Sequence, residues 1–194
     1  MTVSREVDAE ALVAAADVAG VSITDVLLCG LSDALASHPA FNATFEDGTH
    51  RLYEEHNVGV AVAIEDGLVA PVVADVAERS VGDIASERRR LTEAVQAGDY
   101  AMADLRGGTF TVSNLGPLGV DGFTPIINPP QVAILGVNRV QQRARPDDSE
   151  GVVFRRTLPL DLSFDHQVVD GADAARFLRT LAANVEAAAE YVEG

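Results

Sequence analysis

Apolar residues recur along this chain at two spacings, one typical of strands and one typical of helices. Residues 3–7 alternate apolar and polar side chains, which predicts a short strand. Residues 22–37 carry apolar side chains at helical spacing, which predicts a helix. His38-Pro39 should end it, because a residue before proline disfavours helical backbone. Asp8 is expected to cap an earlier helix that runs to Val18.

The longest apolar runs predict buried strands. Residues 57–64 and 68–73 flank a tight turn, so we expect both in the middle of a sheet, buried on both faces. Residues 141–151 are polar and charged and predict an exposed hairpin tip. The other predicted elements are hairpin strands at 42–45 and 49–53, helices at 80–97 and 172–189, and strands at 109–114, 131–139 and 152–163. The pattern predicts one α/β domain with a mixed sheet and about four helices.

Length and composition bound the class of protein. A chain of 194 residues suits one domain, and 47% hydrophobic residues are enough for a core. No apolar run approaches the ~18–20 residues of a membrane span, and the N-terminus lacks the pattern of a signal peptide. The one cysteine, Cys29, has no internal partner for a disulfide, which favours a reducing, cytoplasmic setting.

The charge is strongly negative. The formal net charge is −16, and all 14 basic residues are arginine. Such a surface should repel nucleic acid and offers no reason to expect it as a partner. One interpretation is a protein adapted to high salt, where screening weakens self-repulsion, and the other is simply an acidic protein from a GC-rich genome. We favour the first interpretation.

Residues 163–171, Ser-Phe-Asp-His-Gln-Val-Val-Asp-Gly, hold the best candidate for proton transfer. His166 lies where a predicted strand meets a predicted helix, between Asp165 and Asp170. Histidine is the side chain whose ordinary titration is nearest neutrality, and a neighbouring carboxylate could orient it. The alternative is a capped helix, with Asp170 as the N-cap and Asp165 bonded to backbone N–H groups.

Ser113 is a second candidate, at the end of a predicted strand that leads into a glycine-rich loop. It lacks the sharp Gly-x-Ser-x-Gly turn of a serine nucleophile, but its hydroxyl could donate to an oxyanion. The alternative is a serine bonded only to backbone.

The other residues that could carry chemistry give no strong prediction of a functional site. The four histidines and Cys29 lack metal-ligand spacing, so we expect no metal, and Cys29 is predicted to lie in the core. We expect His38 to end a helix and His50 and His56 to be solvated. Arg88-Arg89-Arg90 spans a wide helical arc, which favours a solvated face over a phosphate site.

Three long segments carry a family resemblance. Residues 108–116, 123–137 and 163–171 resemble the catalytic domain of dihydrolipoamide acyltransferases, the core subunits of 2-oxo acid dehydrogenase complexes, and shorter stretches at 38–42 and 67–73 are similar too. The resemblance implies one acyltransferase domain over residues 1–194 with a chloramphenicol acetyltransferase-like fold. It also implies homotrimers, which can assemble into a larger cage.

The resemblance implies roles for particular residues. His166 would take the proton from the CoA thiol, and Ser113 of a neighbouring subunit would stabilise the tetrahedral oxyanion. Asp170 would support the histidine turn. Contacts to CoA or substrate are expected from Asn114, Gly116 and Thr124. CoA is then a substrate, the lipoyl group comes on the lipoyl domain of a separate protein, and neither a metal nor a membrane is involved.

Two departures from the family pattern leave two hypotheses open. Gln167 stands where the family usually has arginine, and Met1 opens almost directly on the first strand, without the family's basic N-terminal segment, lipoyl domain or subunit-binding domain. The chain is either an active acyltransferase or a catalytically weak or inactive trimeric scaffold subunit. His166, Asp170 and Ser113 are all present, which favours activity. The sequence does not identify the acyl group.

Overall fold

The strand β11 (Val152–Phe164) is the longest in the molecule and pairs with three others. The computed structural model describes residues 1–65, 67–146 and 151–193. Its main sheet has the order β1-β11-β9-β8-β4-β7, with β10 also paired to β11. Only β4/β8 and β8/β9 are parallel pairs, so the predicted mixed sheet is confirmed. The other main-sheet strands are β1 (Thr2–Asp8), β4 (Val58–Val60), β7 (Val72–Val73), β8 (Phe110–Asn114), β9 (Ala133–Val137) and β10 (Gln141–Pro146).

Four α-helices are described: α1 (Glu10–Ala19), α2 (Ile23–Ser37), α3 (Val81–Ala97) and α4 (Gly171–Glu186). Ser22 caps α2 in a capping box with Asp25, and Ser80 caps α3 at the start of the helix predicted over 80–97. The prediction that Asp8 caps α1 is wrong by one residue. Ala9 occupies the cap, while the Asp8 carboxylate accepts a hydrogen bond from the Glu10 N–H at 2.9 Å. Short 3₁₀ turns lie at Pro39–Phe41, Val76–Glu78, Met102–Leu105, Gly116–Leu118 and Ala188–Tyr191.

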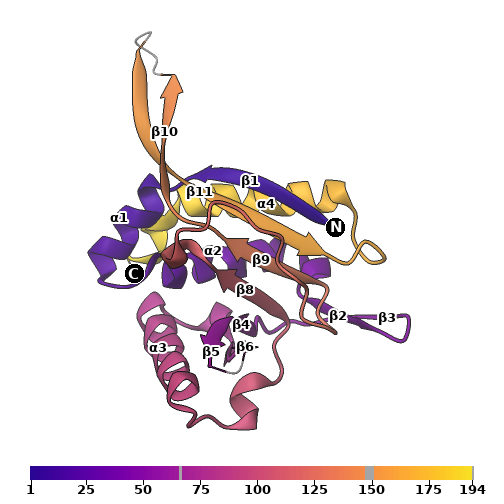
Figure 1. The fold of residues 1–194 in the computed structure, drawn as a ribbon. Coiled ribbons are helices and arrows are strands. Elements are labelled where there is room, and N and C mark those ends of the chain that lie inside the picture. The colour runs from indigo at the N-terminus through magenta and orange to yellow at the C-terminus, as the bar shows by residue number, and fades with distance from the viewer. Residues whose placement is uncertain (66, 147–150, 194) are drawn as a thin grey trace.

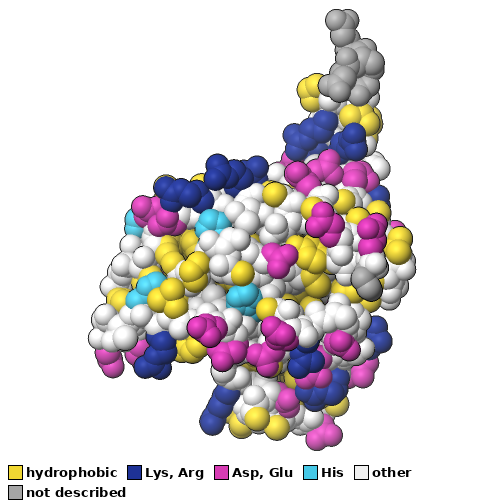
Figure 2. Space-filling model, turned by 180° about the vertical axis from the view of Figure 1, so that it is seen from behind, with side chains coloured by type: hydrophobic (Ala, Val, Ile, Leu, Met, Phe, Trp, Pro, Cys, Tyr) yellow, Lys and Arg dark blue, Asp and Glu magenta, His cyan; other side chains and the backbone are white. Residues whose placement is uncertain are grey.

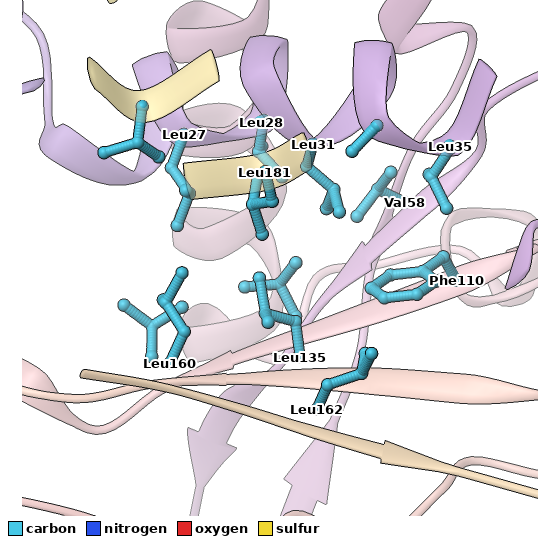
Figure 3. Packing of buried hydrophobic residues seen from close by; sticks show 14 of the residues in the cluster. Leu27, Leu28, Leu31, Leu35, Val58, Phe110, Leu135, Leu160, Leu162 and Leu181 are labelled. Carbon is cyan, nitrogen blue, oxygen red and sulfur yellow. The ribbon is translucent and has the colours of Figure 1, made fainter. Parts of the chain in front are cut away.

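The core lies between one face of the sheet and helices α2 and α4, which lie behind the sheet in Figure 1. Figure 3 shows leucines of α2 and Leu181 of α4 facing side chains from four strands. Ten residues labelled there are at most 1% exposed: Leu27, Leu28, Leu31, Leu35, Val58, Phe110, Leu135, Leu160, Leu162 and Leu181. Each such burial contributes about 1.5–3 kcal/mol to folding. Because this face is filled, a site along the sheet must use the opposite face or the strand ends.

The predicted buried strand pair over 57–73 is only half correct. β4 and β7 pair within the main sheet, but β5 (Val62–Ile64) and β6 (Gly67–Val69) form a separate two-stranded sheet. The β4/β7 ladder ends after Val60, whose N–H donates to the Pro71 carbonyl at 2.9 Å, while the Ala61 N–H donates to Val112 of β8 at 2.8 Å. Pro71 has no N–H to extend that ladder. Leu68 in β6 is consequently 66% exposed.

Two hairpins extend from the body (Figure 1). One is the predicted β2 (Ala43–Glu46) and β3 (Thr49–Leu52) pair. The other is formed by β10 and the start of β11, where Arg143 and Arg145 pair with Glu6 of β1. The predicted exposed hairpin tip over 141–151 is confirmed for 141–146, which form the exposed strand β10 of this hairpin. Residues 147–150 lie outside the described residues.

Acidic side chains are spread widely over the face shown in Figure 2, as the net charge of −16 requires. No single described helix is long and apolar enough to cross a membrane. Helices α1 and α2 are long and apolar enough only when they are taken together, and the chain bends by 117° between them.

Candidate functional site

The turn between β11 and α4 presents His166 to solvent. The Asp165 carboxylate accepts a hydrogen bond from the Gln167 N–H at 2.9 Å, and its backbone carbonyl accepts from the Val168 N–H at 3.1 Å. The His166 ring is exposed and lies 5.7 Å from the ring of Phe164 between centroids. Asp165 therefore holds the turn, as predicted, and the imidazole nitrogens stay accessible.

Asp170 is the N-cap of α4. Its carboxylate accepts hydrogen bonds from the N–H groups of Ala172 at 2.7 Å and Asp173 at 2.9 Å. The Asp173 N–H, followed by that of Ala172, holds the pKa of the Asp170 carboxyl below its ordinary value, with smaller contributions from Arg176 and His166. This is the capped-helix geometry expected in the alternative interpretation. Asp170 thus fixes the point where the histidine turn ends.

Ser113 opens into a cavity on the side of the sheet away from the helices. It lies on β8, is 8% exposed, and has no hydrogen-bond partner for its hydroxyl among the residues that the structure describes. The cavity has a volume of about 500 Å³ and will be called the Ser113 cavity. Its walls include Thr111, Leu115, Phe123, Thr124, Ile126 and Ile134. The backbone partner considered for this serine is not found within the described residues.

A second cavity, called the Asn114 cavity, lies beside the first and has a volume of about 460 Å³. The two share Ala61. The Asn114 side chain donates to the Thr24 hydroxyl at 3.0 Å and accepts from the Gly116 N–H at 2.9 Å. Any larger residue at Gly116 would place its Cβ 2.6 Å from the Asn138 carbonyl oxygen. The structure thus groups Asn114 with Gly116, and places Thr124 in the neighbouring Ser113 cavity.

Two residues of the Asn114 cavity were not found from the sequence. Arg88, predicted on a solvated face, instead forms a two-pronged ion pair with Asp25, with N–O distances of 2.5 and 3.0 Å. Asp25 is fully buried, so this pair fixes α3 to the start of α2. Asn138 is 1% exposed, and its side-chain oxygen has no hydrogen-bond partner among the described residues. No local pattern marks either feature, because the partners lie far apart in the sequence.

A single chain does not bring His166 and Ser113 together. Strand register places Asp161 of β11 opposite Gly136 of β9, and Gly136 opposite Ser113 of β8. His166 lies five residues beyond Asp161 and two strands from β8, so strand geometry separates it from Ser113 by roughly 15–20 Å. The two side chains must come from different copies to act on one bond.

The other histidines correct one expectation. His38 ends α2 as predicted, and its ring nitrogen lies 2.8 Å from the Thr180 hydroxyl. His56 was expected in solvent but is only 7% exposed, with Nδ1 2.6 Å from the Ser32 hydroxyl oxygen. Burial lowers the pKa of His56, because it disfavours the charged ring.

The remaining single candidates are structural. His50 is half-buried, with Nε2 3.2 Å from the Ala40 carbonyl oxygen, rather than fully solvated. Cys29 packs against the core from α2, as predicted. Over residues 1–65, 67–146 and 151–193, no three His, Cys, Asp or Glu side chains are grouped so as to hold a metal ion.

The chain matches the family described as 2-oxoacid dehydrogenases acyltransferase (catalytic domain) over residues 1–192. It is 38% identical over 166 residues to the dihydrolipoyllysine-residue acetyltransferase component of the Haemophilus influenzae pyruvate dehydrogenase complex, covering 84% of this chain and 29% of that protein. It is 42% identical over 146 residues to a succinyltransferase component of the 2-oxoglutarate dehydrogenase complex from Bartonella vinsonii, covering 75% and 35%. The chain therefore spans about a third of these relatives.

Solved structures agree with the sequence comparison. The dihydrolipoamide acetyltransferase of Azotobacter vinelandii, studied for the roles of a serine, a histidine and an asparagine in its catalytic mechanism, superposes with a TM-score of 0.89 at 33% identity, covering 95% of this chain and 80% of that one. The cubic core of a pyruvate dehydrogenase multienzyme complex gives the same TM-score, identity and coverage. Chloramphenicol acetyltransferase, at 18% identity and a TM-score of 0.64 over 95% and 87% of the two chains, shares the fold. The chain belongs to the family of 2-oxoacid dehydrogenase acyltransferase catalytic domains.

Proposed function

We propose that this protein transfers an acyl group between dihydrolipoamide and CoA. The observation that carries the proposal is the pair of cavities at the end of β8, which meet at Ala61 on either side of Ser113 and Asn114. Both cavities are mainly apolar; the first contains the Ser113 hydroxyl, which has no partner among the described residues, and the second also presents amide, hydroxyl and guanidinium groups. Two substrates that meet end to end at Ser113 would suit this arrangement. Family membership supports the same reaction class.

In the proposed reaction, His166 acts as the general base. A thiol near pH 7 is mostly protonated, since thiols titrate near ~8.5, and only the thiolate is a good nucleophile. His166 would take the CoA thiol proton as sulfur attacks the thioester carbonyl of the acylated lipoyl group. The intermediate then loses the lipoyl sulfur, forming the CoA thioester, and His166 returns the proton to the dihydrolipoamide thiol.

Ser113 is proposed to donate its hydroxyl proton in a hydrogen bond to the tetrahedral oxyanion. Such a donor is most effective when its direction is fixed in advance and it has no competing partner in the ground state. Its position in a buried strand and the absence of a described partner for Oγ both support this role. Asp170 is a positioning residue, because its carboxylate is bonded to the start of α4.

The two substrates are assigned to different cavities. The Asn114 cavity, with Asn114 and Gly116, would hold CoA, whose amides suit the buried Asn138 oxygen. Arg88 and Arg139 also line it, and their guanidinium groups are paired with Asp25 and Asp121. The Ser113 cavity, with Thr124, would admit the lipoyl arm and the acyl group. The family match assigns residues 1–192 to the catalytic domain, so the lipoyl group would be delivered on a lipoyl domain outside these residues.

The proposed unit is a homotrimer in which each active site combines His166 of one copy with Ser113 of the next. The separation of these residues within one chain supports a shared site. The cubic core among the solved relatives supports assembly of trimers into a larger cage.

A weak or inactive scaffold subunit is the second candidate. It is favoured by Gln167, which removes the cation that the family usually has beside the histidine. The test is transfer from acetyl-CoA to free dihydrolipoamide in molar salt, comparing the wild type with His166→Ala and Ser113→Ala, and with His50→Ala as a histidine control outside the site. We expect Ser113→Ala to lower kcat by ~10²–10³ with little change in the KM for acetyl-CoA. Equal rates for wild type and His166→Ala would leave only the scaffold function.

A further inference from the structure

The Ser113 cavity has no charged side chain in its described lining. Around Ser113 the walls are formed by Thr111, Leu115, Phe123 and Ile134, with Ile126 and Ile127 towards the opening. Thr111 cannot readily turn to a ligand, because its hydroxyl donates to the Gln131 side-chain oxygen at 2.6 Å. An acyl group whose carbonyl oxygen lies at the Ser113 hydroxyl would therefore be surrounded mostly by carbon, with Thr124 and Asn128 as further polar residues of the lining.

Phe123 is held in place beneath this cavity. Its ring lies against Gly136 of β9 so closely that a Cβ there would come within 2.9 Å of the ring. Its backbone N–H donates at 3.2 Å to Asp161, a buried carboxylate that also accepts from Asn138 at 2.7 Å and from Ser4. The aromatic wall is therefore part of the rigid sheet and would not easily yield to a polar substrate group.

The turn that carries His166 adds no free cation. Gln167 follows the histidine directly and is neutral, while Asp165 and Asp170 contribute negative charge. The nearest basic group on α4, Arg176, is paired with Asp173 at 2.5 Å. When a neighbouring copy supplies His166, the charge that accompanies it is therefore negative.

From these observations we infer that the enzyme is selective for uncharged aliphatic acyl groups, such as acetyl or isobutyryl, and discriminates against acyl groups that end in a carboxylate, such as succinyl. This inference rests on the proposed acyltransferase activity and specifies its substrate class. A terminal carboxylate in the cavity would lose water and would find no cation in the described walls, only the neutral polar groups of Thr124 and Asn128. Sequence identity does not make this distinction, since both acetyl- and succinyltransferases are among the relatives.

The test compares acetyl-, isobutyryl- and succinyl-CoA as donors to free dihydrolipoamide, with kcat/KM measured for each. An unpaired charged group should lower kcat/KM for succinyl-CoA on the order of 100-fold relative to acetyl-CoA. Molar salt is suitable, because screening over ~3 Å leaves direct contacts in a cavity largely intact. A succinyl-CoA value within threefold of acetyl-CoA would overturn the inference and leave the acyltransferase function standing. Failure of all three donors would overturn both.

A second comparison uses Leu115, which follows the end of β8 and lines the same cavity as Ser113. Leu115→Arg supplies the missing cation, and Leu115→Gln is the matched control with similar length and no charge. We expect Leu115→Arg to raise the succinyl-to-acetyl ratio of kcat/KM about tenfold over the control, as a charge-assisted hydrogen bond would. Equal ratios for the two variants would show that missing positive charge does not set the selectivity.

Discussion

The buried ion pair between Asp25 and Arg88 gives the sharpest prediction about stability. Asp25 is fully buried in the first turn of α2, whereas the Arg88 side chain on α3 retains 21% exposure. The Asp25 carboxylate also accepts from the Ser22 N–H at 2.9 Å, which completes the capping box. Because the two partners differ in burial, removing Arg88 and removing Asp25 should lower the free energy of unfolding by different amounts.

Replacing Arg88 by Met leaves a carboxylate with no access to water and no cation. Removal of one partner of a buried pair typically costs ~3–5 kcal/mol, so Arg88→Met should lie near the upper end. Asp25→Asn leaves a guanidinium that is partly exposed and can turn to solvent, and its cost should be about 2–3 kcal/mol. The double variant Asp25→Asn/Arg88→Met should recover most of the loss, because neither charge is then left alone.

The assay is urea unfolding at constant salt, followed by circular dichroism, with Arg90→Met as control. Arg90 pairs with Glu87 and Asp104 but is 54% exposed, so its loss should cost less than about 1 kcal/mol. An Arg88→Met cost similar to that of Arg90→Met would refute the reasoning. So would a larger cost for Asp25→Asn than for Arg88→Met.

Three further predictions concern Cys29, His56 and the net charge. Burial, followed by the nearby carboxylates of Asp33 and Asp25, raises the pKa of the Cys29 thiol to about 11. Roughly one thiol in a thousand is then ionised at pH 8, so Ellman's reagent should react at least ~100-fold more slowly with the folded protein than with the protein in urea, and equal rates would contradict this. Burial lowers the pKa of His56, so the folded state resists its protonation and stability should fall as pH drops below ~6.5. His56→Gln should reduce this fall between pH 7.5 and 5.5 while the control His50→Gln should not, and identical pH profiles for all three proteins would remove His56 as the cause. Adaptation to high salt predicts that Tm rises between dilute buffer and molar potassium chloride, because screening weakens repulsion at net charge −16; a flat or falling Tm would favour the simpler acidic-protein interpretation.

Local patterns in the sequence correctly predicted most of the helices and strands that bury one apolar face in the core. The helices α2 and α3 begin and end within a residue of their predicted bounds, because capping serines and a C-terminal glycine mark them. The strand β11 was predicted from 152–163 and runs to Phe164. The histidine turn was predicted at its correct place between β11 and α4.

Contacts between distant segments were not predictable in the same way. The apolar run at 57–64 does not reveal that β4 ends at Val60 and that β5 joins a separate sheet, because the pairing of β4 depends on β8, some fifty residues later along the chain. His56 occurs in a polar stretch and is buried only because α2 supplies Ser32. Arg88 belongs to a run of three arginines, and only the fold distinguishes it by placing Asp25 opposite.

The shared active site can be tested directly by mixing two inactive variants. His166→Ala and Ser113→Ala each lack one of the two groups, and co-expression with different affinity tags allows trimers that contain both to be isolated. In a mixed trimer, an interface that takes His166 from the Ser113→Ala copy and Ser113 from the His166→Ala copy is complete.

Each cyclic trimer that contains both variants, in either 2:1 ratio, has one complete interface out of three. In the isolated mixed trimers, acetyl transfer to dihydrolipoamide should then recover to about a third of the wild-type rate, although each variant alone is nearly inactive. If mixed trimers form but remain as inactive as the separate variants, His166 and Ser113 do not act across an interface, and the proposed mechanism is contradicted.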